Sequence, residues 1–290
     1  MSITIKSFRN INKIFEYLDS LSIGTDDYIF RGHRDKEWTL QTTLHRHRKY
    51  FVSFDVEEMI KKFRANLVKI GIRPFENGNN NRLNWLEYAR HYGVPTPCID
   101  FTHSPYIALF FAFTGAVIKY GKNSDFVYVY ALNQKALAHD WAYNINTSPP
   151  APKTHHDIYE DFLNQPLSVW YTGYPMGELF LIPYSSSYTQ RILRQQGLLL
   201  YDTIDYNGNS MKDLEGYISK INEPSGSKET LIKIKIPKKF VSAIFERLEM
   251  MGITGGNLFV SQEGAQIDIM NSYHYNTKTS NLRDIDFDNA

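Results

Sequence analysis

Residues 96–113 read TPCIDFTHSPYIALFFAF and contain a short apolar run, a polar turn and a longer apolar run. The first run predicts a buried strand that ends near Asp100. Ser104 and Pro105 are the residue types that favour the N-cap and the first position of a helix, so the second run predicts a buried helix. Asp100 and Thr102 therefore lie where a strand is followed directly by a helix.

This junction has the chemistry of an anion site and also of a simple structural cap. The start of a helix exposes unpaired N–H groups and a partial positive charge, and the hydroxyls of Thr102 and Ser104 add donors that suit a phosphate or a polarised carbonyl. In the alternative interpretation, Ser104 is only a helix cap and Asp100 is only the ion-pair partner of Arg31. The residues alone leave both interpretations open.

Arg31 and Gly32 form a second candidate within YIFRGHRDKEW, residues 28–38. An arginine at the end of a short strand can direct its planar, paired donors into a cleft, and this geometry suits a phosphate or a carboxylate. A structural ion pair of Arg31 with Asp100 explains the same pattern.

Two further groups are weaker candidates. His91 and Tyr92 end a predicted helix, where Tyr92 could stack on an aromatic ring and His91 could exchange a proton, although packing at the helix end is the simpler interpretation. Gln195, in RILRQQGLLLYD (191–202), precedes a glycine and a strand. Its amide could bind a ribose hydroxyl or only pair with an edge strand.

Periodicity predicts the remaining elements. Helices are expected in residues 7–21 with Ser7 as N-cap, in 54–71 with Ser53 as N-cap, before Gly93, and in 238–252. Strands are expected in residues 125–132, 178–184, 197–202 and 230–237, and a last strand in 265–270. Because strands and helices do not alternate regularly, we expect an α+β fold with a mixed, largely antiparallel sheet, continuous or split, flanked by helices.

Composition narrows the class of protein. The 290 residues are 14% aromatic and carry a net charge of +1, which indicates a folded protein without a global basic field for nucleic acid or membrane. Cys98 is the only cysteine, which excludes an internal disulfide and a thiolate-based zinc site. The longest apolar run is shorter than the roughly 20 residues of a membrane span, and the N-terminus lacks a signal-peptide pattern. Rossmann, P-loop and G-x-S-x-G motifs are absent. We expect a cytoplasmic protein without a membrane partner or a metal.

Three blocks together resemble the FRG domain family, named for its Phe-Arg-Gly signature. They are YIFRGHRDKEWTLQTTLHRH, WLEYARHYGVPTPCIDFTHSPYIALFFAF and QRILRQQGLLLYD, and the resemblance covers roughly residues 8–202. Arg90 stands where the family pattern prefers glutamine, and Phe101 where it prefers tryptophan. We take these departures to lie away from the polar residues.

The order of these blocks is similar to the layout of ADP-ribosyltransferases and implies that NAD is the substrate. The resemblance then implies that Asp100 and Gln195 act in catalysis, Asp100 as charged stabiliser and Gln195 on the ribose hydroxyls. The residues implied to bind the dinucleotide are Arg31, Gly32, His91, Tyr92, Thr102 and Ser104. The layout is a fold-level analogy. Many such transferases carry a glutamate at the position of Gln195, so this glutamine could alter acceptor choice, favour hydrolysis or prevent turnover.

The implied activity is ADP-ribosyl transfer to a protein or nucleic acid, or NAD hydrolysis, in a bacterial toxin or anti-phage defence effector. The alternatives are a non-catalytic module that binds a nucleotide or polyanion through Arg31, Arg34, Arg46 and Arg48, and an interaction protein whose polar cluster only stabilises the fold. We expect one FRG-type domain in residues 1–270, a loop-rich insertion around 203–230 and a polar tail in 271–290. The acceptor, the oligomeric state and any trigger or antitoxin stay open.

Overall fold

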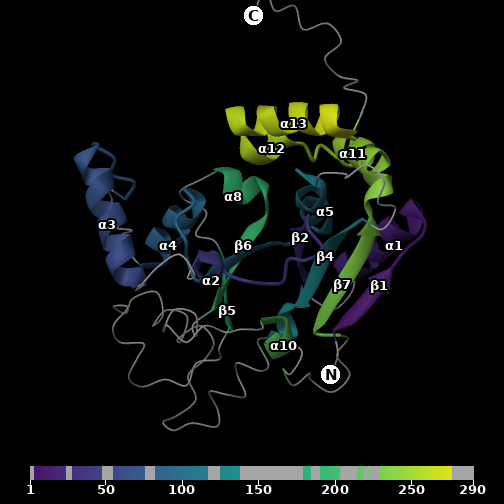
Figure 1. Ribbon diagram of the computed structural model, residues 1–290, viewed down its shortest axis with the longest axis horizontal. Coiled ribbons are helices and arrows are strands. Elements are labelled where there is room, and N and C mark those ends of the chain that lie inside the picture. Colours follow the sequence, from purple (N-terminus) through teal and green to yellow (C-terminus); the bar gives the residue numbers. More distant parts are fainter. Residues whose placement is uncertain are drawn as a thin grey trace, which may run out of the picture.

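A computed structural model describes residues 3–23, 28–47, 55–75, 82–116, 125–137, 179–183, 190–202, 214–218, 221 and 229–275. Figure 1 shows one central sheet with helices on its faces, and the α+β architecture is as expected. The strands are β1 (Thr4–Ser7), β2 (Tyr28–His33), β3 (Cys98–Thr102), β4 (Phe126–Asn133), β5 (Leu179–Pro183), β6 (Gly197–Asp202) and β7 (Leu231–Pro237).

The main helices before the middle of the chain are α1 (Ile11–Ser22), α2 (Thr43–His47), α3 (Val56–Lys69), α4 (Arg82–His91) and α5 (Pro105–Phe113). Those that follow are α8 (Gln190–Arg194), α10 (Leu214–Ile218), α11 (Val241–Met250), α12 (Gly255–Phe259) and α13 (Gln262–Tyr275), with a short 3-10 turn η3 (Lys238–Phe240) before α11. No helix within these described ranges is long and apolar enough to cross a bilayer.

Within the described residues the sheet has seven strands in the order β1-β7-β4-β2-β3-β6-β5, and all neighbours are antiparallel except β1 and β7. The mixed, largely antiparallel sheet is therefore confirmed. Its two halves meet at β2 and β3, which share a single registered pair, Phe30 with Thr102. Were that ladder to continue, Gly32 would face Asp100, but the two strands separate there. The sheet is therefore continuous, but β2 and β3 are paired at one position only.

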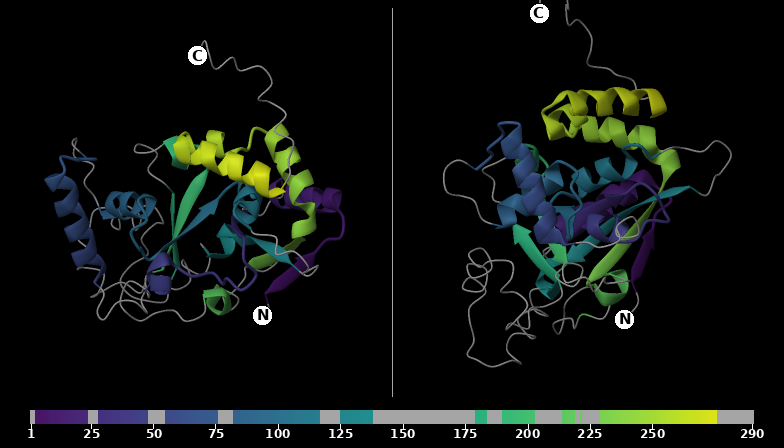
Figure 2. Two further views of the ribbon diagram at one scale, coloured as in Figure 1. Left: turned by 45° about the horizontal axis from the view of Figure 1, so that its top comes forward. Right: turned by 60° about the vertical axis from the view of Figure 1, so that its left-hand side comes forward.

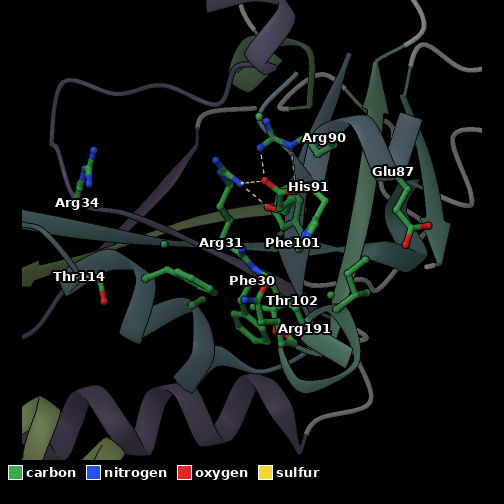
Figure 3. Close-up of a pocket in the computed structure, with 18 of the residues that line it drawn as sticks. Phe30, Arg31, Arg34, Glu87, Arg90, His91, Phe101, Thr102, Thr114 and Arg191 are labelled. Carbon is green, nitrogen blue, oxygen red and sulfur yellow. Dashed lines mark hydrogen bonds and ion pairs between the residues drawn. The ribbon is translucent and has the colours of Figure 1, made fainter. Parts of the chain in front are cut away.

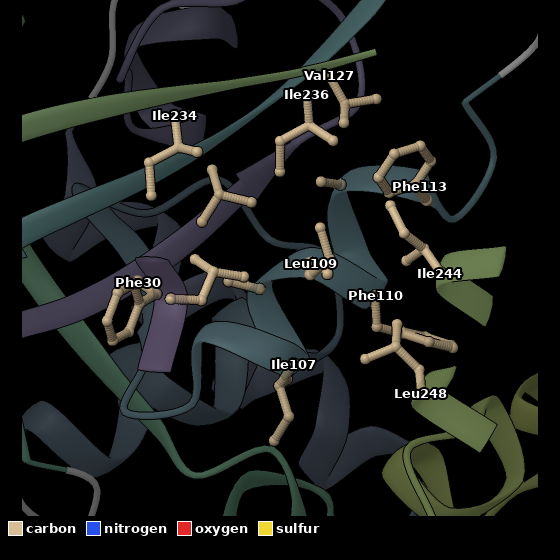
Figure 4. Packing of buried hydrophobic residues seen from close by; sticks show 14 of the residues in the cluster. Phe30, Ile107, Leu109, Phe110, Phe113, Val127, Ile234, Ile236, Ile244 and Leu248 are labelled. Carbon is tan, nitrogen blue, oxygen red and sulfur yellow. The ribbon is translucent and has the colours of Figure 1, made fainter. Parts of the chain in front are cut away.

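One hydrophobic core lies between the sheet and helices α1, α5 and α11 (Figure 4). Alternate residues of β4 and β7 contribute Val127, Ile234 and Ile236 to it, because successive side chains of a strand point to opposite faces. Phe110 of α5 packs edge-on against Phe245 of α11. On the opposite face a second core gathers Ile29, Phe101, Tyr130 and Leu200 together with residues of α10.

Helix α5 begins as predicted, since Ser104 is the N-cap and its hydroxyl accepts the backbone N–H of Ile107. The helix then crosses β2 directly above Gly32. A Cβ atom at Gly32 would come within 2.0 Å of the Ala108 carbonyl oxygen and 2.5 Å of the Ala112 nitrogen. Gly32 is therefore required for close packing of a helix on a strand, a role that differs from the predicted contact with a dinucleotide.

Several predicted boundaries are wrong for local physical reasons. Asn10 caps α1 through its side-chain oxygen, whereas Ser7 ends β1. Asp55 caps α3 by accepting the N–H groups of Glu57 and Glu58, and Ser53 lies outside the described residues.

The part of the 203–230 insertion that the structure describes contains α10, a short helix whose Leu214 and Ile218 are buried in the second core. That part of the insertion is therefore not all loop.

The largest error concerns the C-terminal region. Residues 265–270 were expected to form a strand, but they lie inside α13, which continues to Tyr275. The predicted tail therefore does not start at residue 271, because Asn271 and Tyr275 are buried and the Tyr275 hydroxyl donates a hydrogen bond to the Phe113 carbonyl. Residues 276–290 lie outside the described residues. Figure 2 shows α13 lying across α11 and α12 on the helical side of the molecule.

Candidate functional site

A cavity of about 440 Å³ opens where β2 and β3 separate. Its walls come from β2 and the turn after it, α4, β3, α5, α8 and the start of β6. The residues that line it are Phe30, Arg31, Gly32, Arg34, Trp38, Glu87, Arg90, His91, Gly93, Asp100, Phe101, Thr102, Ala108, Phe111, Thr114, Arg191, Ile192, Gln195 and Gly197. Stretches that are far apart in the sequence therefore share one hollow, as the sequence predicts for Arg31, Asp100 and Gln195.

Arg31 bridges the gap between the two strands. Its Nη1 donates to the backbone carbonyl of Asp100 at 2.6 Å and lies 3.6 Å from carboxylate atom Oδ2 of the same residue. Its Nε donates to Nε2 of His33 at 2.9 Å. The guanidinium thus satisfies a carbonyl that the interrupted ladder leaves unpaired, because buried backbone acceptors need a partner. Its Nη2 has no hydrogen bond to any residue that the structure describes, so this donor is available to a ligand.

His33 accepts a hydrogen bond from Arg31 and so fixes the position of the guanidinium. Burial, followed by the charge of Arg31, lowers the pKa of His33 far below its ordinary value, so the imidazole is neutral. A neutral ring can accept the Arg31 N–H at Nε2 when Nδ1 carries the proton, and Nδ1 lies 3.4 Å from the Trp38 carbonyl. Burial also lowers the pKa of Arg31 to about 10, which still leaves the guanidinium charged at neutral pH.

Asp100 has a second and closer cationic partner that the sequence interpretation misplaced. Arg90, at the end of α4, donates from Nε to Oδ1 at 3.1 Å and from Nη2 to Oδ2 (Figure 3). Its Nη1 donates to the hydroxyl of Thr43, which ties α2 to the same cluster. The departure from the family pattern at position 90 therefore contacts the predicted catalytic carboxylate directly, contrary to the expectation that it lay away from the polar residues.

The two arginines fix the charge of Asp100. Burial alone would raise the pKa of this carboxyl, but the charge and hydrogen bonds of Arg90 and the charge of Arg31 hold it well below its usual range. Asp100 is thus ionised at every physiological pH. Its side chain is still 43% exposed, so the carboxylate remains open to the cavity.

Thr102 and Gln195 join β3 to the turn before β6. The Thr102 hydroxyl donates to the Gln195 carbonyl at 2.7 Å and accepts the N–H of Ser104 at 3.1 Å. The Gln195 side-chain nitrogen donates to the carbonyl of Leu258 in α12 at 3.3 Å. Its side-chain oxygen makes no hydrogen bond with any described residue, so the amide presents a free acceptor beside the cavity.

Two of the predicted binding residues lie outside the cavity lining. Ser104 uses its hydroxyl to cap α5, and Tyr92 is 59% exposed, with its ring against Tyr88 and His91. The N–H groups of Ser104 and Ile107 are already taken up by the hydroxyls of Thr102 and Ser104, which leaves fewer backbone donors at this helix entrance for the expected phosphate. His91 does line the cavity, and burial together with Arg191 lowers its pKa.

The cavity also contains residues that the sequence interpretation did not place there. Arg191 lies 4.1 Å from the ring centroid of Phe259 and pairs with Glu263 at 3.0 Å, and Arg34 lies over the Trp38 ring at 5.0 Å. Glu87 lines the cavity at the far side from Arg34 (Figure 3). Spacing on α4 is the signal that could have found it, because Glu87, Arg90 and His91 lie at i, i+3 and i+4 and share one helix face.

The charged side chains of the lining are mostly cationic, with four arginines against the two acids Glu87 and Asp100. Planar, paired donors of this kind recognise phosphate and carboxylate groups. No set of three or more potential His, Cys, Asp or Glu metal ligands is found among the described residues.

Residues 26–119 match the family model of the FRG domain. The matched segment runs from just before β2 to just after α5 and so contributes Arg31, Arg90 and Asp100 to the cavity. About a third of the chain is therefore similar to the FRG domain family. No curated protein and no solved structure matches it.

Proposed function

We propose that the cavity binds NAD and that the protein cleaves the nicotinamide–ribose bond, passing ADP-ribose to an acceptor or to water. One observation carries this proposal. The gap between β2 and β3 brings a guanidinium with a free donor, an ionised carboxylate and an amide with a free acceptor into one cavity, and these belong to Arg31, Asp100 and Gln195. Their chain order is that of the ADP-ribosyltransferase layout, which supports the proposal by analogy.

The residues suit the substrate in charge and in the chemistry of the cavity wall. Arg31, through its free Nη2, and Arg34 supply cationic donors for the pyrophosphate, which carries negative charge. Trp38 and Phe111 supply apolar ring surface on the cavity wall. The volume of about 440 Å³ lies within the range of small-molecule sites.

The proposed chemistry uses Asp100 as a fixed charge. As the bond to nicotinamide breaks, the ribose gains positive charge, and a preorganised carboxylate stabilises that charge at no cost of reorganisation at the moment of reaction. Asp100 suits this role because Arg90 and Arg31 keep it ionised and rigid. The free oxygen of Gln195 would accept a ribose hydroxyl and orient the sugar.

The activity would consume a central metabolite or modify a protein or nucleic-acid acceptor. Either outcome fits an effector that slows the growth of its own host cell, as in a toxin or a defence system against phage. We include this role in the proposal as the biological consequence of the chemistry.

A non-catalytic function is the second candidate, and one observation favours it. Asp100 is neutralised by two arginines, which weakens its field, while the cavity keeps a surplus of cationic side chains. A cavity of this kind would hold a nucleotide or another polyanion without transforming it.

The deciding experiment incubates the purified protein with NAD, alone and with cell lysate as acceptor source, and measures free nicotinamide. We expect release by the wild type and a loss of at least about 100-fold in Asp100→Asn, since removing a key electrostatic stabiliser typically costs that much. Expression of the wild type should slow growth, and the same substitution should relieve it. Lys36→Ala is the matched control, because this exposed residue of the turn after β2 does not line the cavity.

Two contrary outcomes separate the candidates. Absence of nicotinamide release from the wild type under both conditions would remove the enzyme proposal. Calorimetric binding of ADP-ribose without any NAD cleavage would instead support the anion-binding module.

A further inference from the structure

Glu87 is an acidic side chain inside the same cavity that no role described so far uses. It lies on the face of α4 that also carries Arg90 and His91, and it is only 6% exposed. An acid this buried is unusual unless it is paired. The burial of Glu87 therefore needs a chemical explanation.

Glu87 has no ion pair with any described residue, and its Oε1 is enclosed without a hydrogen-bond partner. Arg90, one turn further along the same helix, directs its guanidinium to Asp100 instead. The other charged or titratable side chains lining the cavity are Arg31 and Arg34 from β2 and the turn after it, His91 from α4, Asp100 from β3 and Arg191 from α8. From α3, which packs on α4, Arg64 lies over the Trp85 ring.

An ionised carboxylate with an enclosed and unpaired oxygen is costly, so this environment favours the protonated acid. Burial raises the pKa of Glu87 to about 8. The side chain therefore exchanges its proton close to physiological pH, where a general acid or base is most effective.

The other candidates for proton transfer are less suitable. Both oxygens of Asp100 are held by Arg90, and its pKa is far too low for it to retain a proton. The pKa of His91 is lowered by burial and by Arg191, which makes its ring a weaker base. Glu87 is the strongest base among the carboxylates and imidazoles that line the described part of this cavity.

We propose that Glu87 is the general base of the cavity, accepting the proton of the hydroxyl or water that attacks the ribose. This inference rests on the proposed cleavage of NAD. In the step, the C1′–nitrogen bond breaks and its electron pair leaves with neutral nicotinamide. A bond forms between C1′ and the attacking oxygen, and the proton of that oxygen moves to the Glu87 carboxylate. Asp100 keeps its charge throughout, so the two acids have separate roles.

The test is the pH profile of nicotinamide release between pH 6 and 9 for the wild type, Glu87→Gln and Glu16→Gln. The wild-type kcat should rise with pH and level off above the pKa of Glu87, because only the ionised form accepts a proton. Glu87→Gln should lose this rise, and its kcat at the upper end should fall by about 100-fold or more, within the usual contribution of general-base catalysis. Its KM for NAD should change by less than about threefold. Glu16, exposed on α1, provides the matched control and should keep the wild-type profile.

The outcomes distinguish this inference from the proposed function. A wild type that releases nicotinamide with an unchanged profile in Glu87→Gln would overturn the role of Glu87 alone. A wild type that releases none at any pH would overturn the cleavage activity and with it the role of Glu87. Thermal unfolding of Glu87→Gln, which preserves the size of the side chain, would show whether a lost activity reflects a lost fold.

Discussion

At the scale of single residues, the protonation of each acid in the site depends on whether an arginine contacts it. Asp100 meets Arg31 and Arg90 and stays charged, whereas Glu87 meets neither and holds its proton. The two acids lie in one cavity, and their pKa values are shifted in opposite directions by their partners and burial. This separation of pKa values is the pattern that divides acid–base work from electrostatic work in enzyme sites.

The raised pKa of Glu87 predicts a specific dependence of stability on pH. The pKa of Glu87 is about 8 in the folded protein and 4.5 in an unfolded chain, so its contribution to the free energy of unfolding is fully present below pH 4.5 and is lost as pH rises through 8. Glu87→Gln removes this titration. We take the free energy of unfolding of the variant minus that of the wild type. This difference should be about 3–5 kcal/mol larger above pH 8 than at pH 4.5. Urea unfolding of both proteins across this range measures the effect.

Glu16→Gln again serves as the control for this measurement, since its side chain is 60% exposed on α1. A difference between Glu87→Gln and the wild type that stays constant from pH 4.5 to 9 would contradict the assigned burial of Glu87.

Sequence reasoning reached part of this residue-level picture. The contact of Arg31 with Asp100 is one of the alternatives that the sequence predicts, because both residues are expected near strand ends, beside a glycine or a helix start. Arg90 was considered only as a departure from a pattern, since nothing in the linear sequence shows that the last turn of α4 folds back beside β3. The i, i+3, i+4 spacing of Glu87, Arg90 and His91 could have placed Glu87 on the cavity face of α4, but its burial is decided by tertiary packing and is not visible in the sequence.

At the scale of elements, β2 and α5 fit together because residue 32 has no side chain. We predict that Gly32→Ala is strongly destabilising, by about 3 kcal/mol. Overpacking a core typically costs about 1–3 kcal/mol, and this methyl group would overlap the backbone of α5, which places it at the upper end. Equilibrium urea unfolding measures the loss.

Gly256→Ala is a suitable comparison for Gly32→Ala. The nearest atom to a Cβ at Gly256 would be 3.4 Å away, and its backbone does not adopt a positive φ, so the change should stay within about 1 kcal/mol. Equal losses in the two variants would show that the close packing of α5 on β2 has no special weight.

The strands were largely predictable from alternation, and the helices from capping residues and apolar stripes. Sequence patterns did not predict β1 or the short helices α2, α8, α10 and α12. The longest missed element is α13, whose inward face contains Gly264, Ile267, Asn271 and Tyr275, while Ile269 and Met270 are exposed. A helix that buries glycine and asparagine and exposes isoleucine has no apolar stripe to detect. The short alternation in residues 265–270 therefore indicated a strand that does not form.

At the scale of the whole molecule, the C-terminal helix closes the first core. Tyr275 is 4% exposed, its ring stacks on Phe245, and its hydroxyl donates to the carbonyls of Phe113 and Ala116. The end of α13 is therefore tied to the end of α5, the helix that forms one wall of the cavity.

This arrangement predicts that Tyr275→Ala destabilises the protein by about 3–5 kcal/mol, the usual cost of deleting a buried ring, and that Tyr275→Phe costs about 1 kcal/mol for its lost hydrogen bonds. Denaturant unfolding gives both values. Tyr273→Ala, on the same helix but 84% exposed, should change stability by less than about 0.5 kcal/mol. A comparable loss in Tyr273→Ala would mean that α13 does not face the core as described.

The bridge that Arg31 makes to the Asp100 carbonyl has a practical consequence for mutagenesis. The same guanidinium that would offer Nη2 to the proposed ligand also joins the two halves of the sheet where their backbone ladder stops. One side chain would therefore both stabilise the sheet and bind the ligand. An inactive protein with alanine at position 31 would be ambiguous, and Arg34, which carries no such tie, is the position at which affinity can be probed in isolation.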